Sequence, residues 1–243
     1  MRAYVDCSDK RSESIKDSLK QAGYCLLSKN LIKDCSLVYL GMQGDKYSDQ
    51  DFMSLADVYT LCYHPAIEKQ CELSNAKYHN LSNDKDFVYQ NTLFTIEGLI
   101  GYLITNEKQS IHDNTYLILG YGNLGKQAYK VLRALDACVY VATDNIEEHF
   151  QLQKDAILYS LLSCCYPRTI TVIINTVPAP VISLENDNVK IYDLASKPYG
   201  LNELISSLSY QRLSSLPTYY HTPLSGKMIA NTIMKRDDLI VNE

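Results

Sequence analysis

A glycine-rich turn limits the fold of this chain more than any other feature of its sequence. It consists of Gly120, Tyr121, Gly122, Asn123, Leu124 and Gly125 and has the spacing G-x-G-x-x-G. Residues 116–119 before it form an apolar run typical of a buried strand, and residues 123–135 after it have the spacing of an amphipathic helix. Another apolar run follows at residues 138–142. The sequence therefore predicts the opening β-α-β unit of a Rossmann-type domain.

Each glycine of this turn has an expected role in binding a nicotinamide dinucleotide, NAD or NADP. Gly120 allows the tight turn, Gly122 lets the backbone approach the pyrophosphate, and Gly125 permits close packing of the helix on the strand. The helix N-terminus would then direct its unpaired N–H groups and the positive end of its dipole at the phosphates. The alternative is a Rossmann turn that has lost its ligand, since a fold survives the loss of a function.

An acidic residue near the end of the second strand would accept hydrogen bonds from the adenosine ribose hydroxyls. Asp144 lies close to this position, 24 residues after Gly120, while Thr143 occupies the expected strand tip. A carboxylate here would repel a 2'-phosphate, so Asp144 favours NAD over NADP. A solvated loop aspartate is the alternative interpretation.

A later apolar run, residues 171–174, ends in Asn175, Thr176 and Pro178. Ligands of open α/β sheets bind at the carboxyl ends of the strands, so these residues are expected to line the nicotinamide side of the site. An Asn-Thr pair that caps its own turn is the alternative.

The first part of the chain alternates short apolar runs, at residues 3–5, 24–27, 37–40 and 58–61, with a helical pattern at residues 12–22. This alternation predicts an α/β domain. Residues 75–86 are polar and rich in turn formers, and residues 91–104 are apolar enough for one buried helix. We place a domain boundary near Tyr89, treat that helix as the connector, and expect a last amphipathic helix at residues 225–234 to pack back on the first domain.

Composition excludes several classes of function. The 23 basic and 28 acidic side chains give a net charge of −5, which argues against nucleic acid and anionic membranes as partners. No apolar run is long enough to span a membrane, and the N-terminus lacks a signal-peptide core. The eight cysteines contain no C-x-x-C pair and are expected to be buried, reduced thiols of a cytoplasmic protein. The histidines have no metal-ligand spacing, so no metal site is expected.

Five blocks of sequence together resemble the A-type subunit of dipicolinate synthase in order and spacing. They are residues 91–98, 117–125, 174–178, 193–200 and 226–231. The block D-L-A-S-K-P-Y-G at residues 193–200 is the most specific after the glycine turn. The resemblance implies an α/β protein with two doubly wound parallel sheets: an N-terminal flavodoxin-like domain (1–89), a connecting helix and Rossmann-type NAD(P)-binding domain (90–220), and a C-terminal helix (221–243) that packs on the first domain.

The resemblance also implies an activity. It is hydride transfer between a nicotinamide cofactor and a small dicarboxylate of the dihydropyridine type during spore formation, and a flavoprotein-like second subunit is a possible partner. We also expect a homo-oligomer. Asn91, Thr95, Glu97 and Ser196 match the family's substrate side, and Lys197 would pair with a substrate carboxylate where the family more often has arginine. From its place before the last helix, His221 would act as acid or base, although a surface histidine is the alternative.

Two departures from the family pattern support other functions. Ser215-Leu-Pro-Thr218 replaces a glycine-bounded turn, and Pro223 stands where the family has a lysine. These changes favour a non-catalytic NAD(P)-binding subunit or sensor as one alternative. A D-2-hydroxyacid dehydrogenase-like enzyme is the other, although the Arg, Glu and His set of that family has no convincing place here.

Overall fold

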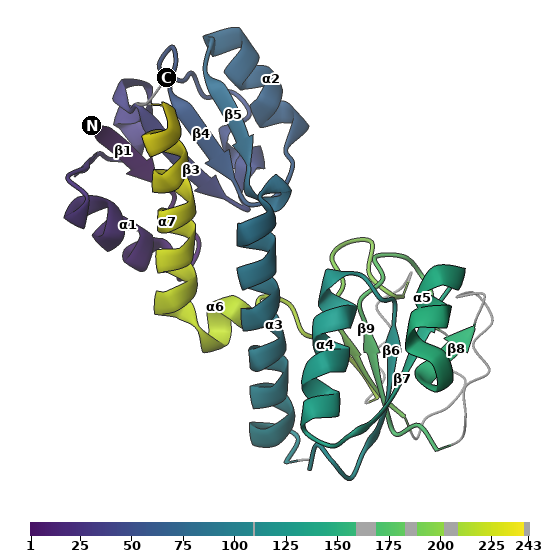
Figure 1. Ribbon diagram of the computed structural model, residues 1–243. Coiled ribbons are helices and arrows are strands. Elements are labelled where there is room, and N and C mark those ends of the chain that lie inside the picture. The colour runs from purple at the N-terminus through teal and green to yellow at the C-terminus, as the bar shows by residue number, and fades with distance from the viewer. Residues whose placement is uncertain (109, 159–168, 183–188, 202–208, 241–243) are drawn as a thin grey trace. The chain divides into compact units, whose positions relative to one another are not determined.

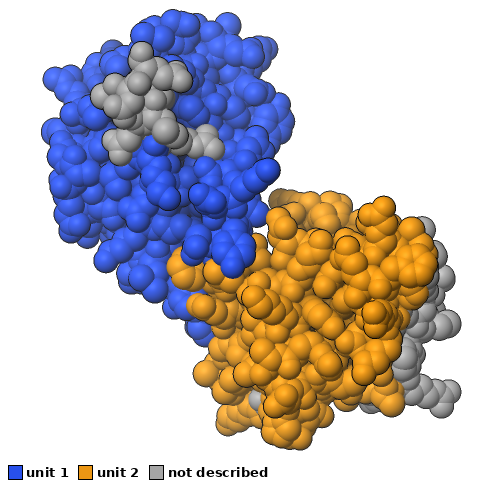
Figure 2. Space-filling model, viewed as in Figure 1, with its two compact units in different colours: residues 1–91, 217–243 blue, residues 92–216 orange. Residues whose placement is uncertain are grey.

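The computed structural model describes residues 1–108, 110–158, 169–182, 189–201 and 209–240, which form two compact units. Unit 1 contains residues 1–91 and 217–243, and unit 2 contains residues 92–216 (Figure 2). The boundaries expected from the sequence were residues 89 and 220. Both units consist of parallel sheets with helices between the strands, so the predicted α/β class is confirmed.

Unit 1 is built on a five-stranded parallel sheet with the order β2-β1-β3-β4-β5, which is the order of flavodoxin-like folds. Its strands are β1 (Arg2–Val5), β2 (Cys25–Leu26), β3 (Leu37–Gly41), β4 (Asp57–Thr60) and β5 (Lys77–Asn80). Strand β5 lies within residues 75–86, a segment that the sequence analysis described only as polar and rich in turn formers. Its Lys-Tyr-His-Asn sequence gives no apolar signal because the strand lies at an edge of the sheet.

The helices of unit 1 cover both faces of this sheet, and Figure 1 shows α1 and α7 lying side by side on one of them. The α-helices are α1 (Ser12–Gln21), α2 (Pro65–Ser74), α6 (Leu216–Tyr220) and α7 (Thr222–Ile240), and the 3-10 helices are η1 (Lys29–Asp34), η2 (Gly44–Tyr47) and η3 (Leu81–Asn83). The last helix is thus longer than the predicted residues 225–234. It packs on the first part of the chain, with Ile229, Ala230 and Ile233 fully buried.

Alternate residues of β1, β3 and β4 enter two different cores. Ala3, Val5 and Tyr39 join the cluster under α1 and α7, whereas Tyr4 and Val38 join the cluster on the opposite face with residues of η1 and α2. A parallel sheet is buried on both faces, which explains why the sequences of its central strands are continuous apolar runs.

Unit 2 is built on a six-stranded parallel sheet with the order β11-β10-β9-β6-β7-β8. The strands are β6 (Thr115–Leu119), β7 (Cys138–Thr143), β8 (Ala156–Leu158), β9 (Val172–Asn175), β10 (Lys190–Asp193) and β11 (Tyr210–Arg212). Numbered within the unit, this is the Rossmann order 3-2-1-4-5-6, whose direction reverses between β6 and β9. The helices are α3 (Lys85–Thr105), whose first residues belong to unit 1, α4 (Asn123–Ala134), α5 (Ile146–Leu152) and η4 (Gln153–Asp155).

The structure bears on the expected burial of the cysteines and on the expected absence of a membrane-spanning segment. Cys35 and Cys71 are buried thiols, but Cys7, Cys25 and Cys138 are exposed, so the expectation of general burial is wrong for these three. Cys164 and Cys165 lie outside the described residues. None of the described helices has the length and hydropathy needed to cross a membrane.

Candidate functional site

The glycine turn lies between β6 and α4, at the point where the strand order of unit 2 reverses. Gly120 has a φ of +88°, and a Cβ there would lie 2.7 Å from Val177 Cγ2. A Cβ at Gly125 would lie 2.2 Å from the carbonyl oxygen of Gly120. Only glycine therefore fits these two positions, because one needs a left-handed backbone and the other has no room for a side chain.

Gly122 is different, because no heavy atom lies within 4 Å of the position that its Cβ would occupy. The residue is exposed and is the N-cap of α4, where no side chain among the described residues caps the helix. The first N–H groups of a helix lack partners within the helix, and they carry its positive partial charge. Open space in front of an uncapped helix start is what a bound pyrophosphate needs, so this turn fits a dinucleotide.

The end of β9 supplies the opposite wall of the turn. Thr176 donates from Oγ1 to the carbonyl oxygen of Leu119, 2.8 Å away, and thereby joins β9 to β6 just before the glycine turn. Asn175 is completely buried, and its amide donates to Val177 O and accepts from Val177 N. Asn175 thus caps its own turn, as in the alternative interpretation, whereas Thr176 bonds the neighbouring strand. Pro178 is exposed beyond them.

Asp193, at the end of β10, organises the neighbouring loop. Its side chain is buried and accepts four hydrogen bonds, over distances of 2.6–3.0 Å, from Asn175 Nδ2, Ala195 N, Gly200 N and Tyr210 Oη. Backbone and side-chain donors from β9, β11 and the loop compensate the desolvation of the carboxylate. The conformation of residues 193–200 therefore depends on one carboxylate that the sequence showed only as part of a motif.

Arg212, on the strand beside this loop, is a candidate site residue that the sequence analysis missed. It ends β11 and pairs in register with Asp193. Its Nε donates to Tyr210 Oη over 3.1 Å, and its Cζ lies 4.1 Å from the ring centroid of Tyr199. Burial and the hydrogen bond to Asp193 raise the pKa of Tyr210 to about 12, so this hydroxyl stays protonated and accepts from Arg212 at neutral pH. An arginine held over an aromatic ring is preorganised for a carboxylate.

The expected adenosine end of the site is acidic. Thr143, buried at the end of β7, donates to Glu148 Oε2 over 2.6 Å and accepts from Asn145 N. Glu148 also lies 3.9 Å from Lys126 Nζ, which is in turn 5.2 Å from the ring centroid of Tyr121. Asp144 is exposed beside this pair. The carboxylates of Asp144 and Glu148 thus lie near the end of β7, and Lys126 lies close to both Glu148 and Tyr121 of the glycine turn.

The remaining predicted residues are distributed over both units. Ser196 and Lys197 are exposed on the loop held by Asp193. Thr95 and the exposed Glu97 lie on the part of α3 that belongs to unit 2, whereas Asn91 is the last residue of the first segment of unit 1. His221 belongs to unit 1, where its N–H donates to Pro217 O over 3.0 Å at the junction of α6 and α7. The structure thus brings together the glycine turn, Asn175, Thr176 and the 193–200 loop within unit 2.

Asn123 and Leu124 complete the turn as the first two residues of α4, the former exposed and the latter half-buried. Among the described residues, no three His, Cys, Asp or Glu side chains are grouped so that they could hold a metal ion.

Solved structures with this fold include several dehydrogenases. The A-type subunit of dipicolinate synthase from Bacillus halodurans has a TM-score of 0.78 at 18% identity, covering 96% of this chain and 97% of that chain. The corresponding polypeptide of dipicolinate synthase from Bacillus subtilis has a TM-score of 0.76 at 17% identity, covering 100% and 98%. D-lactate dehydrogenase with NAD+ from Lactobacillus jensenii has a TM-score of 0.57 at 12% identity, covering 100% and 98%.

No family model and no curated protein sequence matches this chain. The resemblance to the A-type subunit of dipicolinate synthase, inferred from five short motifs, is confirmed by the structures as a similarity of fold over nearly the whole chain.

Proposed function

We propose that this protein is an oxidoreductase that transfers hydride between a nicotinamide dinucleotide and a small dicarboxylate of the dihydropyridine type, as its resemblance to dipicolinate synthase implies. The observation that carries the proposal is the open, uncapped glycine turn at the switch point of a Rossmann sheet. Similar folds include a dehydrogenase solved with NAD+, which supports a nicotinamide cofactor. The protein would be cytoplasmic and homo-oligomeric, and it would act with a flavoprotein-like second subunit, as expected from the sequence.

The cofactor would be held by two groups of residues in unit 2. The N–H groups at the start of α4 would bind the pyrophosphate, with Gly122 leaving room for it. Asp144 and Glu148 would face the adenosine ribose and repel a 2'-phosphate, so NAD is the expected form. When bound, the nicotinamide ring would accept or supply the hydride.

The substrate carboxylates would be bound by Arg212 and by Lys197, the latter at the position where the family more often has arginine. Arg212 offers its two terminal nitrogens to one carboxylate while Tyr199 and Tyr210 hold the guanidinium. Lys197 is exposed on the same loop and would neutralise the second carboxylate as a point charge. In the oxidative direction a ring carbon loses a hydride, a proton leaves the neighbouring position, and the ring becomes aromatic.

The test is a fluorescence titration of the full chain with NADH and NADPH, repeated on Gly122→Val. The backbone angles of Gly122 are φ −71° and ψ −167°, which valine adopts without strain, so the variant should melt like the wild type. We expect NADH to bind in preference to NADPH, and the variant to bind at least about tenfold more weakly. If neither nucleotide binds at millimolar concentration, the proposed function is overturned.

A non-catalytic nucleotide-binding subunit is the second candidate, because two positions depart from the family pattern: Thr218 stands in place of a turn glycine, and Pro223 stands in place of a lysine. Pro223 is exposed in the first turn of α7, and Thr218 lies within α6. NADH binding, together with no formation of NADH from NAD+ when a dihydropyridine-type dicarboxylate is supplied, would favour this candidate.

A further inference from the structure

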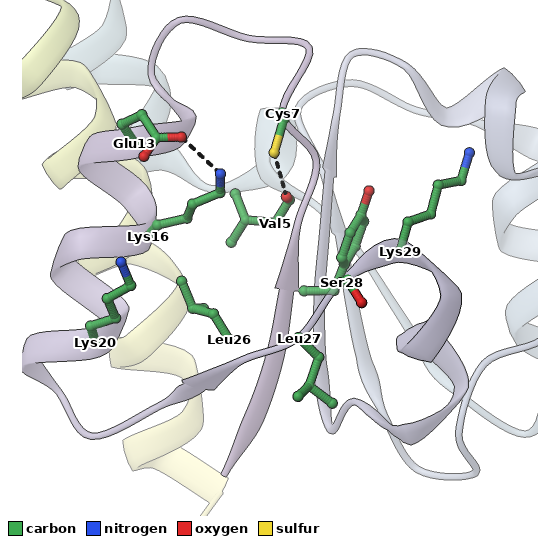
Figure 3. Close-up of a pocket in the computed structure, with 10 residues that line it drawn as sticks. Val5, Cys7, Glu13, Lys16, Lys20, Leu26, Leu27, Ser28 and Lys29 are labelled. Atoms are coloured by element: carbon green, nitrogen blue, oxygen red, sulfur yellow. Dashed lines mark hydrogen bonds and ion pairs between the residues drawn. The ribbon is translucent and has the colours of Figure 1, made fainter.

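Unit 1 contains a pocket that the proposed oxidoreductase function does not use. Its volume is about 500 Å³, within the range of sites for small molecules. It lies at the carboxyl ends of β1 and β2, where Val5, Leu26 and Leu27 form an apolar part of the wall (Figure 3). Ligands of open parallel sheets bind at such ends, but the strand-order rule selects the crevice between β1 and β3. The pocket between β1 and β2 is therefore a separate site.

The charge of the pocket selects its ligand. Three lysines, Lys16, Lys20 and Lys29, line it against one acid, Glu13, which leaves a formal charge of +2 in a chain whose net charge is −5. Lysine ammonium groups gathered in a concave site raise the local concentration of anions. Figure 3 shows the two α1 lysines on one side of the pocket and Lys29, from η1, on the other.

Lys16 is the best placed of the three cations. Only 20% of its side chain is exposed, and its ammonium donates to Glu13 Oε1 over 2.8 Å. Hydrogen bonds with Cys7 and Glu13 raise the pKa of Lys16, so the group is charged at neutral pH. Glu13 is 76% exposed, and an exposed ion pair contributes little to stability. An incoming anion can therefore take the place of the Glu13 carboxylate at low cost.

The other two lysines are held less tightly. Lys20 lies 3.8 Å from Asp17, and both side chains are more than half exposed. The ammonium of Lys29 lies 4.7 Å from the ring centroid of Tyr47. Both residues are exposed, so their flexible side chains can turn their charge toward a ligand in the pocket.

We propose that this pocket binds a small organic anion, a carboxylate or phosphate that carries an apolar group. Lys16 and Lys20 contact the anionic head, Lys29 closes the site from η1, and Leu26 and Leu27 contact the apolar group. The proposal does not depend on the function proposed for unit 2, because all of the residues that line the pocket belong to unit 1.

The experiment is a ¹⁵N–¹H NMR titration of the full chain with benzoate, phenyl phosphate and inorganic phosphate. We expect saturable shifts of the amides of Cys7, Leu27 and Ser28, with a Kd of about 1 mM or tighter for at least one aromatic probe and weaker binding of inorganic phosphate. A preference for phenyl phosphate over benzoate assigns the head group as phosphate, and the reverse assigns a carboxylate.

Three variants control the titration. Lys16→Gln with Lys20→Gln should weaken binding at least about tenfold, the loss expected when charge-assisted hydrogen bonds are removed. Lys33→Gln removes a lysine of η1 that does not line the pocket, and should leave the Kd unchanged. The proposal is overturned if no aromatic probe gives saturable shifts at these amides, or if the double variant binds as the wild type does. NADH titration of the same variants reports on unit 2 alone.

Discussion

Arg212 and Tyr199 form the closest cation–aromatic contact among the described residues of unit 2, at 4.1 Å, and this contact joins the end of β11 to the 193–200 loop. The ring and the Tyr210 hydroxyl fix a side chain that would otherwise have many rotamers. A fixed guanidinium binds a carboxylate with less loss of conformational entropy than an exposed lysine does.

We therefore expect Arg212→Met to weaken the binding of pyridine-2,6-dicarboxylate to the NADH-saturated protein by about tenfold or more, because a charge-assisted bidentate contact is lost. Arg212→Lys should restore only part of the affinity. Isothermal titration calorimetry measures both. Lys130→Met, which removes a positive charge from an exposed position on α4, is the matched control. Equal affinities for all of these proteins would show that Arg212 does not bind the substrate.

Asp193 carries a prediction about stability. Asn at this position keeps the shape but offers one acceptor oxygen, and it directs an NH₂ group at backbone N–H donors such as Gly200 N, 2.8 Å from the carboxylate. We expect Asp193→Asn to lower the free energy of unfolding by about 3 kcal/mol, because buried donors lose their acceptor. Urea denaturation measures the loss, with the exposed Asp49→Asn as control. An unchanged midpoint would mean that the loop does not depend on Asp193.

At the residue scale, the sequence predicted the local features and missed the long-range ones. The glycine turn was predictable because its G-x-G-x-x-G spacing lies within six consecutive residues, although Thr176 and Val177 also pack against it. The role of Arg212 was not, because it depends on Tyr199, 13 positions away, and on the register of β11 with β10. An arginine that ends a strand next to two tyrosines, Tyr199 and Tyr210, is the signal that could have indicated it.

At the scale of elements, strong apolar runs predicted strands correctly, whereas short or polar strands were not predicted. β3, β6 and β9 are buried almost throughout, and their apolar runs indicated them. β5 and β11 lie at the edges of their sheets, where one side has no neighbouring strand, and their sequences are mainly polar. Periodicity reports burial, so it cannot detect strands whose side chains stay near solvent.

The close contact between α1 and α7 at Gly226 leads to a prediction about stability. A Cβ at Gly226 on α7 would lie 2.8 Å from Arg11 O and 2.7 Å from Ser14 Cβ. Helix propensity alone predicts that Gly226→Ala stabilises the protein by about 1 kcal/mol. Overpacking costs about 1–3 kcal/mol, and Arg11 O is backbone and cannot turn away, so we expect a net loss of stability.

Thermal and urea denaturation measure this balance. Lys227→Ala, at the next position of α7 and exposed, has no such contact and serves as the control. A Gly226→Ala variant more stable than the wild type would show that the two helices are not packed this closely.

At the scale of the whole molecule, two parallel sheets with different strand orders share one chain. The sequence indicated the Rossmann unit directly, because its glycine turn is specific. The flavodoxin-like order of unit 1 came only from the family resemblance, since apolar runs show that strands exist but not which of them are neighbours. The same limit applies to the pocket of unit 1, whose lysines are spread over residues 16–29 without a recognisable motif.

Unit 1 is interrupted by unit 2, because residues 92–216 separate its two segments. Its core needs Ile229, Ala230 and Ile233, which are fully buried among residues of β1, α1 and β3. During synthesis on the ribosome these three residues emerge after all of unit 2. Unit 2, the Rossmann-type unit, is therefore completed before the first 91 residues acquire their last helix, which reverses the usual N-to-C order of domain folding.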